Sequence, residues 1–252
     1  MRQSTVVIKY GGHAMENPEL SQAFAEDLAL LAARGMRLVV VHGGGPQISA
    51  LLERLRIESR FADGLRVTDA AAMEVVEMVL CGQVNKAVVS ELASRGVAAA
   101  GISGRDGGLL RARRKNPALG LVGEIVSVDP ALPRCLLDAG FVPVVAPVAS
   151  GPRHEALNIN ADTAAGALAG ALDAEYFVLI SDVPGVLDGQ GELIPRLDAA
   201  QIAALRQSGV ISGGMIPKGA GCGRALILDG RAPSSLRRFL LEDAPLGTVV
   251  TP

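Results

Sequence analysis

Residues 38–50 read LVVVHGGGPQISA, and the interpretation of the whole chain starts from this stretch. An apolar run ends in a histidine, three glycines and a proline follow, and a helical pattern begins after them. A glycine run between a strand and a helix typically binds an anion, because its backbone N–H groups approach the ligand without a Cβ in the way. The pattern is neither the G-x-x-x-x-G-K-[ST] of a P-loop nor the G-x-G-x-x-G of a dinucleotide-binding fold, so the identity of the anion stays open at this point.

The alternation of strand and helix patterns continues on both sides of this stretch and indicates an α/β fold. Short β-branched runs predict buried, mostly parallel strands at residues 5–9, 38–42, 97–100, 141–145 and 176–181. Apolar periodicity predicts helices at residues 20–34, 69–95, 161–172 and 198–207, with Asn160 and Asp198 as N-cap candidates. Shorter strands around residues 109–113 and 122–128 indicate a small antiparallel excursion. There is no internal repeat, and we expect one α/β unit divided near residue 150 into two lobes.

Composition and charge narrow the class of protein. The chain has 252 residues, 49% of them apolar and 20% charged, with a net charge of −2. This charge balance disfavours nucleic-acid binding, which needs many phosphate contacts, and favours a small-molecule partner. Three well-separated cysteines without a C-x-x-C favour a reducing compartment over a disulfide framework or a zinc site. The N-terminus offers no signal-peptide pattern, and no apolar run reaches the roughly 20 residues of a membrane span, so we expect a cytoplasmic protein without membrane contact.

Glycines and polar side chains follow several of the predicted strands, at the edge where α/β sheets bind their ligands. They are Lys9, Gly11 and Gly12; Gly43, Gly44 and Gly45; Asn158, Asn160 and Asp162; Ser181, Asp182 and Gly185; and Lys218 in a later glycine-rich segment. A lysine at the end of a buried strand is costly unless it meets negative charge, so this set favours phosphate chemistry. Each feature taken alone has a structural alternative, namely a tight turn, an N-cap or a solvated lysine.

Eight motifs, taken in chain order, resemble those of the amino acid kinase family. They are KYGGHAM, VHGGGP, GLRVTD, VNK, GISGRDG, NINAD, LISDVPGV and GGMIPK. The resemblance implies a three-layer αβα sandwich around a mainly parallel sheet, in which residues 1–150 bind the phosphate acceptor and residues 151–252 bind ATP. Within the family the motifs are similar to those of the branch that moves the γ-phosphoryl group of ATP to the side-chain carboxylate of N-acetyl-L-glutamate in arginine biosynthesis.

The resemblance also implies residue roles. Lys9 and Lys218 would stabilise the transferring phosphoryl group from opposite sides, and Asp162 would orient both ammonium groups. The remaining implied residues are Gly44, Gly45, Arg66, Asn158 and Asn160 for the acceptor, and Gly11, Gly12, Ser181, Asp182 and Gly185 for ATP and the phosphoryl group. Magnesium would arrive on ATP, so no protein residue is assigned to a metal. An ionised carboxylate acceptor needs no general base, which agrees with the absence of an evident catalytic dyad.

Two departures from the family pattern bear on nucleotide binding and regulation. The segment after Lys218 is shorter by on the order of 8 residues, about two helical turns. Arginine-inhibited members carry an N-terminal helix that links dimers into hexamers and a histidine where this chain has Ser234. We therefore expect a homodimer that arginine does not inhibit. The apolar stripe of residues 69–95 is either a core face or a dimer surface. Alternative functions are a sister kinase acting on carrier-bound aminoadipate or glutamate, on carbamate or on aspartate, and a non-catalytic sensor of nucleotide or amino acid.

Overall fold

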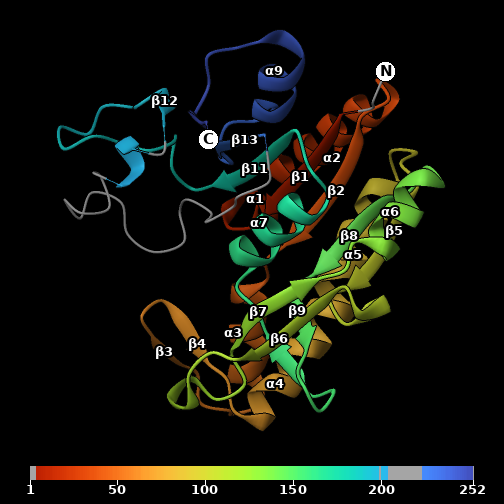
Figure 1. The fold of residues 1–252 in the computed structure, drawn as a ribbon, viewed down its shortest axis with the longest axis vertical. Coiled ribbons are helices and arrows are strands. Elements are labelled where there is room, and N and C mark those ends of the chain that lie inside the picture. The colour runs from red at the N-terminus through yellow and green to blue at the C-terminus, as the bar shows by residue number, and fades with distance from the viewer. Residues whose placement is uncertain (1–3, 199, 204–222, 252) are drawn as a thin grey trace.

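An eight-stranded sheet forms the centre of the protein. The computed structural model describes residues 4–198, 200–203 and 223–251. The strand order is β12-β14-β13-β11-β1-β2-β8-β5, and only the β13–β14 pair is antiparallel (Figure 1). The strands are β1 (Thr5–Tyr10), β2 (Arg37–His42), β5 (Ala99–Ser103), β8 (Val142–Ala146), β11 (Tyr176–Ser181), β12 (Arg196–Leu197), β13 (Arg224–Asp229) and β14 (Thr248–Val250). The predicted mainly parallel sheet is confirmed.

Two smaller sheets lie beside the main one. The predicted antiparallel excursion is a four-stranded sheet of order β10-β9-β6-β7, and a separate hairpin pairs β3 with β4. Their strands are β3 (Arg60–Ala62), β4 (Leu65–Val67), β6 (Leu110–Arg114), β7 (Gly123–Val128), β9 (Val148–Ser150) and β10 (Ala156–Asn158). In Figure 1 the hairpin lies at the lower end of the molecule, opposite the C-terminal helix α9 at the top.

Helices cover both faces of the main sheet. The described helices are α1 (His13–Glu16), α2 (Pro18–Ala33), α3 (Gly45–Arg54), α4 (Ala70–Glu77), the π-helix η1 (Met78–Val84), α5 (Asn85–Ala93), the short 3₁₀-helices η2 (Asp106–Gly108) and η3 (Pro117–Leu119), α6 (Ala131–Asp138), α7 (Ala161–Ala171) and α9 (Ser235–Glu242). None of the helices in the described ranges is long and apolar enough to cross a membrane.

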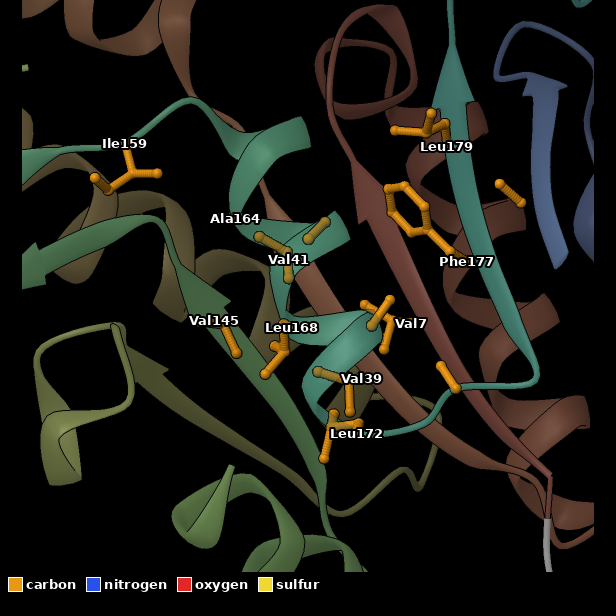
Figure 2. Close-up of a cluster of buried hydrophobic side chains, with 14 of the residues drawn as sticks. Val7, Val39, Val41, Val145, Ile159, Ala164, Leu168, Leu172, Phe177 and Leu179 are labelled. Carbon is orange, nitrogen blue, oxygen red and sulfur yellow. The ribbon is translucent and has the colours of Figure 1, made fainter. Parts of the chain in front are cut away.

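Alternate residues of the central strands enter two separate cores, as the two-residue period of a strand requires. Val7 of β1 packs with Val39, Phe177 and Leu168 beneath α7 on one face, as Figure 2 shows. Its neighbours Val6 and Ile8 enter the other core, which α2, α5 and α9 cover. These two layers of helices around one sheet give the three-layer αβα sandwich.

Three predicted elements differ from the structure. The strands placed at residues 97–100 and 141–145 are shifted to Ala99–Ser103 and Val142–Ala146, a boundary error typical of short apolar runs. The helix placed at residues 69–95 is three segments, with η1 between α4 and α5. Its apolar stripe is fully buried within the chain, so the core alternative is correct and the dimer-surface alternative is wrong for this face. Asp198 does cap a helical turn, since its carboxylate accepts from Gln201 N at 2.7 Å, but residues 204–207 lie outside the described residues.

Candidate active site

The carboxyl ends of β1 and β2 meet the start of α7 at one cavity of about 180 Å³. Parallel pairing aligns Lys9 with Val41 and Tyr10 with His42, so the glycine runs that follow the two strands lie side by side. The cavity is lined by Lys9, Gly11, Gly12, Met15, Glu16, Gly43, Gly44, Gly45, Pro46, Gln47, Asn160, Ala161 and Asp162. Eight of the residues selected from the sequence are therefore brought together, and sequence reasoning missed Met15, Glu16 and Gln47.

Lys9 and Asp162 form an ion pair at this cavity. The distance from Lys9 Nζ to Asp162 Oδ1 is 3.2 Å, and the lysine side chain is 18% exposed. Within the described residues this oxygen accepts no hydrogen bond of good geometry, so the attraction is mainly coulombic. Asp162 stands in the first turn of α7, whose N-cap Asn160 accepts from Thr163 N at 3.0 Å. In the motif NINAD, Asn160 therefore caps the helix, and Asp162, two residues later, directs its carboxylate toward Lys9.

Individual glycines in both runs are required by the space around them. Gly12 has φ +66°, and a Cβ there would lie 2.7 Å from the carboxylate of Asp182. A Cβ on Gly11 would lie 3.2 Å from Lys9 Nζ, and a Cβ on Gly44, which has φ +156°, would lie 2.6 Å from Leu80 Cδ2. At Gly12 and Gly44 both the positive φ and the closeness of neighbouring atoms therefore exclude a residue with a Cβ.

The amides of Gly44 and Gly45 are available to a ligand. Gly43 N donates to Tyr10 O at 2.8 Å, but within the described ranges the next two amides meet no acceptor. Gly45 is the first residue of the ten-residue helix α3, so the positive end of the helix dipole adds to these donors. The two amides and the ammonium of Lys9 lie at one cavity, and hydrogen-bond donors with positive charge are the groups that suit a phosphoryl or carboxylate ligand.

Arg66 lies on the hairpin strand β4 and is only 7% exposed. Its Nη2 donates to Gly45 O at 3.0 Å and to Ser49 Oγ at 2.9 Å, and its Nη1 donates to Ser59 Oγ. The guanidinium carbon lies 4.7 Å from the centre of the Phe61 ring. Burial lowers the pKa of Arg66, and within the described part of the chain no carboxylate pairs with it. A buried, unpaired guanidinium beside Gly45 is suited to an anionic ligand.

Asn158 is connected to Arg66 through a threonine. Its Nδ2 donates to Thr68 Oγ1 at 3.2 Å, and Thr68 Oγ1 donates to Arg66 O at 2.8 Å. Thr68 is fully buried and ties the hairpin to β10. Sequence reasoning missed it, although it lies two residues after Arg66 in GLRVTD, and a hydroxyl between two selected polar residues was the available signal.

The residues selected for the nucleotide on β11 and beyond do not line the cavity. Asp182 follows β11 and faces Gly12, as the close approach above shows. Ser181 O accepts from Gly230 N at 2.7 Å, while Gly185 packs against Leu193 and Thr248 and does not line the cavity. Lys218 lies outside the described residues. In the described ranges no group of three or more His, Cys, Asp or Glu side chains is arranged to hold a metal ion.

His42, which the sequence places at the mouth of the glycine run, is fully buried. Its Nδ1 lies 2.8 Å from Gly43 O and its Nε2 lies 3.2 Å from Asn85 Nδ2. Burial lowers the pKa of His42 to about 4, so the ring is neutral at pH 7. It does not line the cavity and acts on the site only through Gly43.

A model of the amino acid kinase family matches residues 4–230, which is most of the chain and includes every predicted motif. The chain belongs to the amino acid kinase family. It is 50% identical to the acetylglutamate kinase of Gluconacetobacter diazotrophicus over 266 aligned positions, which cover 98% of this chain and 85% of that protein. The solved structure of smu.665 from Streptococcus mutans is 29% identical, with a TM-score of 0.81 and 98% of each chain covered.

The carbamate kinase of Giardia lamblia has the same fold at much lower sequence identity. It is only 14% identical, but it superimposes with a TM-score of 0.68 over 99% of both chains. This likeness concerns the fold alone. It agrees with the three-layer sandwich, carbamate kinase-like in fold, that the motifs imply.

Proposed function

We propose that the protein is an acetylglutamate kinase, which transfers the γ-phosphoryl group of ATP to the side-chain carboxylate of N-acetyl-L-glutamate in arginine biosynthesis. Family membership and the relative that is half identical over nearly the whole chain support a kinase of this branch. The single observation that carries the proposal is the Lys9–Asp162 pair, which faces the unoccupied amides of Gly44 and Gly45 across one small cavity.

Charge neutralisation is the chemical problem that this reaction poses. The acceptor carboxylate is already ionised at pH 7, so no proton has to be removed, but an anion must approach a polyphosphate in line. Lys9 neutralises charge on the transferring group, and Asp162 holds its ammonium in place. Gly11, Gly44 and Gly45 donate backbone N–H groups to the phosphoryl and acceptor oxygens, an arrangement that costs no reorganisation during the reaction. Lys218 is assigned the matching role on the opposite side by family resemblance.

The acceptor is assigned to the N-terminal half, residues 1–150, together with the polar residues before α7. Arg66 would grip the α-carboxylate of the substrate, because a guanidinium binds a carboxylate through two parallel hydrogen bonds. Asn158 can both donate to and accept from an acetamido group, and Asn160 lines the same cavity. The buried and unpaired state of Arg66 supports this assignment.

The nucleotide is assigned to the C-terminal half, residues 151–252, where Ser181, Asp182, Gly185 and the Gly12 turn would contact it. Magnesium would be supplied with ATP and would neutralise part of the phosphate charge. Asp162 and Glu16 are the acidic side chains at the cavity, and two scattered carboxylates suit an ion that keeps most of its ligands from phosphate and water. We further propose a cytoplasmic homodimer.

An acyl phosphate product gives a direct test. The protein is incubated with MgATP and hydroxylamine, which converts an acyl phosphate into a hydroxamate, and four acceptors are offered in turn: N-acetyl-L-glutamate, glutamate, N-acetylaminoadipate and aspartate. Hydroxamate with N-acetyl-L-glutamate alone is the expected result. A signal with a different acceptor alone would replace the proposal by the sister-kinase alternative, and no signal with any acceptor would favour the sensor alternative.

A further inference from the structure

The carbonyl groups of the glycine run are all held by hydrogen bonds to residues that do not line the cavity. Gly43 O lies 2.8 Å from His42 Nδ1, Gly44 O accepts from Ile48 N at 3.0 Å, and Gly45 O accepts from Arg66 Nη2 at 3.0 Å. A trans peptide is planar, so its C=O and the following N–H point in opposite directions. The hydrogen bond on Gly43 O therefore fixes the direction of the Gly44 N–H, and the one on Gly44 O fixes that of Gly45.

His42 holds Gly43 O only if its proton is on Nδ1, and Asn85 determines that. Asn85 is 1% exposed, and its Nδ2 lies 2.9 Å from Val144 O, 3.2 Å from Ile102 O and 3.2 Å from His42 Nε2. The amide nitrogen shares its two hydrogens among these three acceptors and cannot itself accept, so Nε2 has no acceptor to donate to here. The Gly43 carbonyl can only accept, so the proton of the neutral ring is assigned to Nδ1. In the reverse orientation the amide oxygen would face the carbonyls of Val144 and Ile102 without a hydrogen between them.

Lys86 sets the orientation of the Asn85 amide from the other end. Its Nζ donates to Asn85 Oδ1 at 3.0 Å and to Gly101 O at 3.1 Å. An ammonium has donors and no acceptor, so it requires the oxygen of the amide to face it. Gly101 leaves this space free, because a Cβ at that position would overlap Asn85 Oδ1. A chain of directed hydrogen bonds thus runs from Lys86 through Asn85 and His42 to Gly43.

The π-helix η1 brings this chain into position. Leu80 and Val84 of η1 pack against the glycine run at Gly44. A Cβ added to Gly44 would lie 2.6 Å from Leu80 and 3.3 Å from Val84. Asn85 follows η1 directly and reaches beneath His42. Because π-helical turns inside α-helices are frequent at functional sites, this irregularity and the hydrogen-bond chain point to the same loop.

We propose that His42 and Asn85 are positioning residues for phosphoryl transfer: the Lys86–Asn85–His42 chain fixes the imidazole tautomer that turns the Gly44 N–H toward the transferring group. The inference rests on the proposed function, because it assigns the aligned amide to the transition state of that reaction. Misalignment of one such donor is expected to lower kcat on the order of 100-fold while leaving both KM values within about threefold.

Substitutions at His42 separate the two ends of the ring. In His42→Asn the amide N–H replaces Nδ1–H and still donates to Gly43 O, so we expect kcat within roughly tenfold of the unsubstituted protein. His42→Leu fills the space without a donor and is expected to lose on the order of 100-fold. Equal kcat losses in the two folded variants would overturn the inference.

Substitution of Asn85 reverses the direction of the chain. In Asn85→Asp an acceptor faces His42 Nε2, so the ring proton moves there and an Nδ1 lone pair faces Gly43 O. Nitrogen-15 NMR of the imidazoles reports the tautomer directly, and the chain has only two other histidines, His13 and His154, as internal references. We expect Nδ1–H in the unsubstituted protein, Nε2–H in Asn85→Asp, and a fall in kcat that accompanies the switch.

Two further variants keep this test decisive. Lys86→Met removes the exposed donor without disturbing the core, and should lower kcat on the order of tenfold even if Asn85→Asp fails to fold. Leu31→Ala, a core change on α2 far from the cavity, should lower the melting temperature and leave kcat unchanged. Nε2–H in the unsubstituted protein, or a tautomer switch with normal kcat, would reject the inference. Absence of hydroxamate in the unsubstituted protein would reject the proposed function instead, and the tautomer measurement would still decide the hydrogen-bond chain.

Discussion

Lys9 shows how one side chain gains meaning from its place at the end of a strand. A lysine that follows a buried strand predicts contact with negative charge, and the structure supplies Asp162 at 3.2 Å and a cavity beyond it. One protein carboxylate neutralises the ammonium in the free protein. In the proposed reaction the transferring phosphoryl group adds a second anion beside Lys9. We therefore expect Lys9 to stabilise the transition state, where this charge builds up, more than the bound substrates.

Replacing Lys9 by alanine should therefore act on turnover rather than on binding. For Lys9→Ala we expect kcat to fall on the order of 100- to 1,000-fold, with KM for N-acetyl-L-glutamate changed only a few-fold. The hydroxamate assay measures both. Lys115→Ala, at an exposed lysine outside the cavity, is the matched control and should behave like the unsubstituted protein. A near-normal kcat for Lys9→Ala would show that the assigned role is wrong.

Arg66 provides a second test, because lysine is not equivalent to arginine at a site with several fixed acceptors. In Arg66→Lys one ammonium must replace donors to Gly45 O, Ser49 Oγ and Ser59 Oγ and also bind the substrate. We expect KM for N-acetyl-L-glutamate to rise on the order of 10- to 100-fold, because the ammonium cannot make the second of the two charge-assisted hydrogen bonds, which is worth roughly 1.5–3 kcal/mol.

The control for this substitution lies on the same hairpin. Arg60→Lys changes a side chain that is 67% exposed and pairs loosely with Glu58 at 3.8 Å, so both KM values should stay as they are. Initial rates at varied acceptor and fixed MgATP distinguish the two variants. An unchanged acceptor KM in Arg66→Lys would remove the arginine from the acceptor site.

Among the elements, α9 begins without a cap of its own. Its N-cap residue Ser234 has φ 61° and makes no side-chain cap hydrogen bond. Asp27 of α2 supplies the missing acceptor from a neighbouring helix, since its Oδ2 accepts from Arg237 N at 3.2 Å. The side chain of Arg237 lies 3.6 Å from Asp27 Oδ1. Asp27 is only 2% exposed, so this cap requires the burial of a carboxylate, which costs free energy.

This cap predicts a particular pH dependence of stability. Burial raises the pKa of Asp27 from 3.8 to about 6, with Arg237 opposing the shift. A folded-state pKa above the unfolded value stabilises the folded state at low pH, and that contribution is lost as pH rises through about 6. The buried His42, with its pKa lowered to about 4, has the opposite slope between about 4 and 6.5 and partly hides the effect.

The variant Asp27→Asn isolates the carboxylate from His42. Its free energy of unfolding, measured with urea and taken relative to the unsubstituted protein, should become more positive as pH rises from about 4 to 6 and should then level off, because only the unsubstituted protein loses the Asp27 contribution. Glu74→Gln, at an exposed carboxylate on α4 that does not contribute to the Asp27 shift, should give a flat difference over the same range. A flat difference for Asp27→Asn as well would contradict the raised pKa.

The segment of residues 69–95 shows what an element pattern can and cannot reveal. Its apolar residues recur at intervals of four, from Val76 to Leu92, and were interpreted as one helix face. Four residues exceed the 3.6-residue turn of an α-helix, so a continuous α-helix would rotate the last members out of the core. The π-helix η1 restores the phase, and all five side chains are buried. The four-residue interval therefore indicates that an irregular turn is present in this segment, but it does not indicate where the turn lies.

For the whole molecule, the sequence determines the sheet better than the contacts between its layers. Strand runs, glycine runs and the order of motifs predicted the parallel sheet and the cavity at the ends of β1 and β2. The hairpin β3–β4, the link through Thr68 and the burial of His42 depend on side chains far apart in sequence, such as Asn158 with Thr68 and Asn85 with His42. No local periodicity encodes those pairs, so only the folded chain reveals them.

Assembly is the prediction that belongs to the whole molecule. We expect sedimentation analysis to give a homodimer, and we expect millimolar L-arginine to leave the hydroxamate rate unchanged, because Ser234 replaces the histidine of arginine-inhibited relatives. The same runs with and without arginine serve as each other's control. A hexamer, or inhibition at millimolar arginine, would reject this regulatory expectation without affecting the proposed reaction.

Tyr10 gives the molecule a built-in optical reporter. It follows Lys9 directly, stacks on Phe24 with ring centres 3.9 Å apart, and donates its hydroxyl hydrogen to Ala14 O at 2.7 Å. The chain contains no tryptophan and only one other tyrosine, Tyr176. Tyr176 is the first residue of β11, whereas Tyr10 is the last residue of β1. With Tyr176→Phe, the ultraviolet emission of the protein would come from a single ring, one residue from Lys9 of the candidate site. We expect substrate binding to change this emission, so that binding could be followed by light with no dye attached.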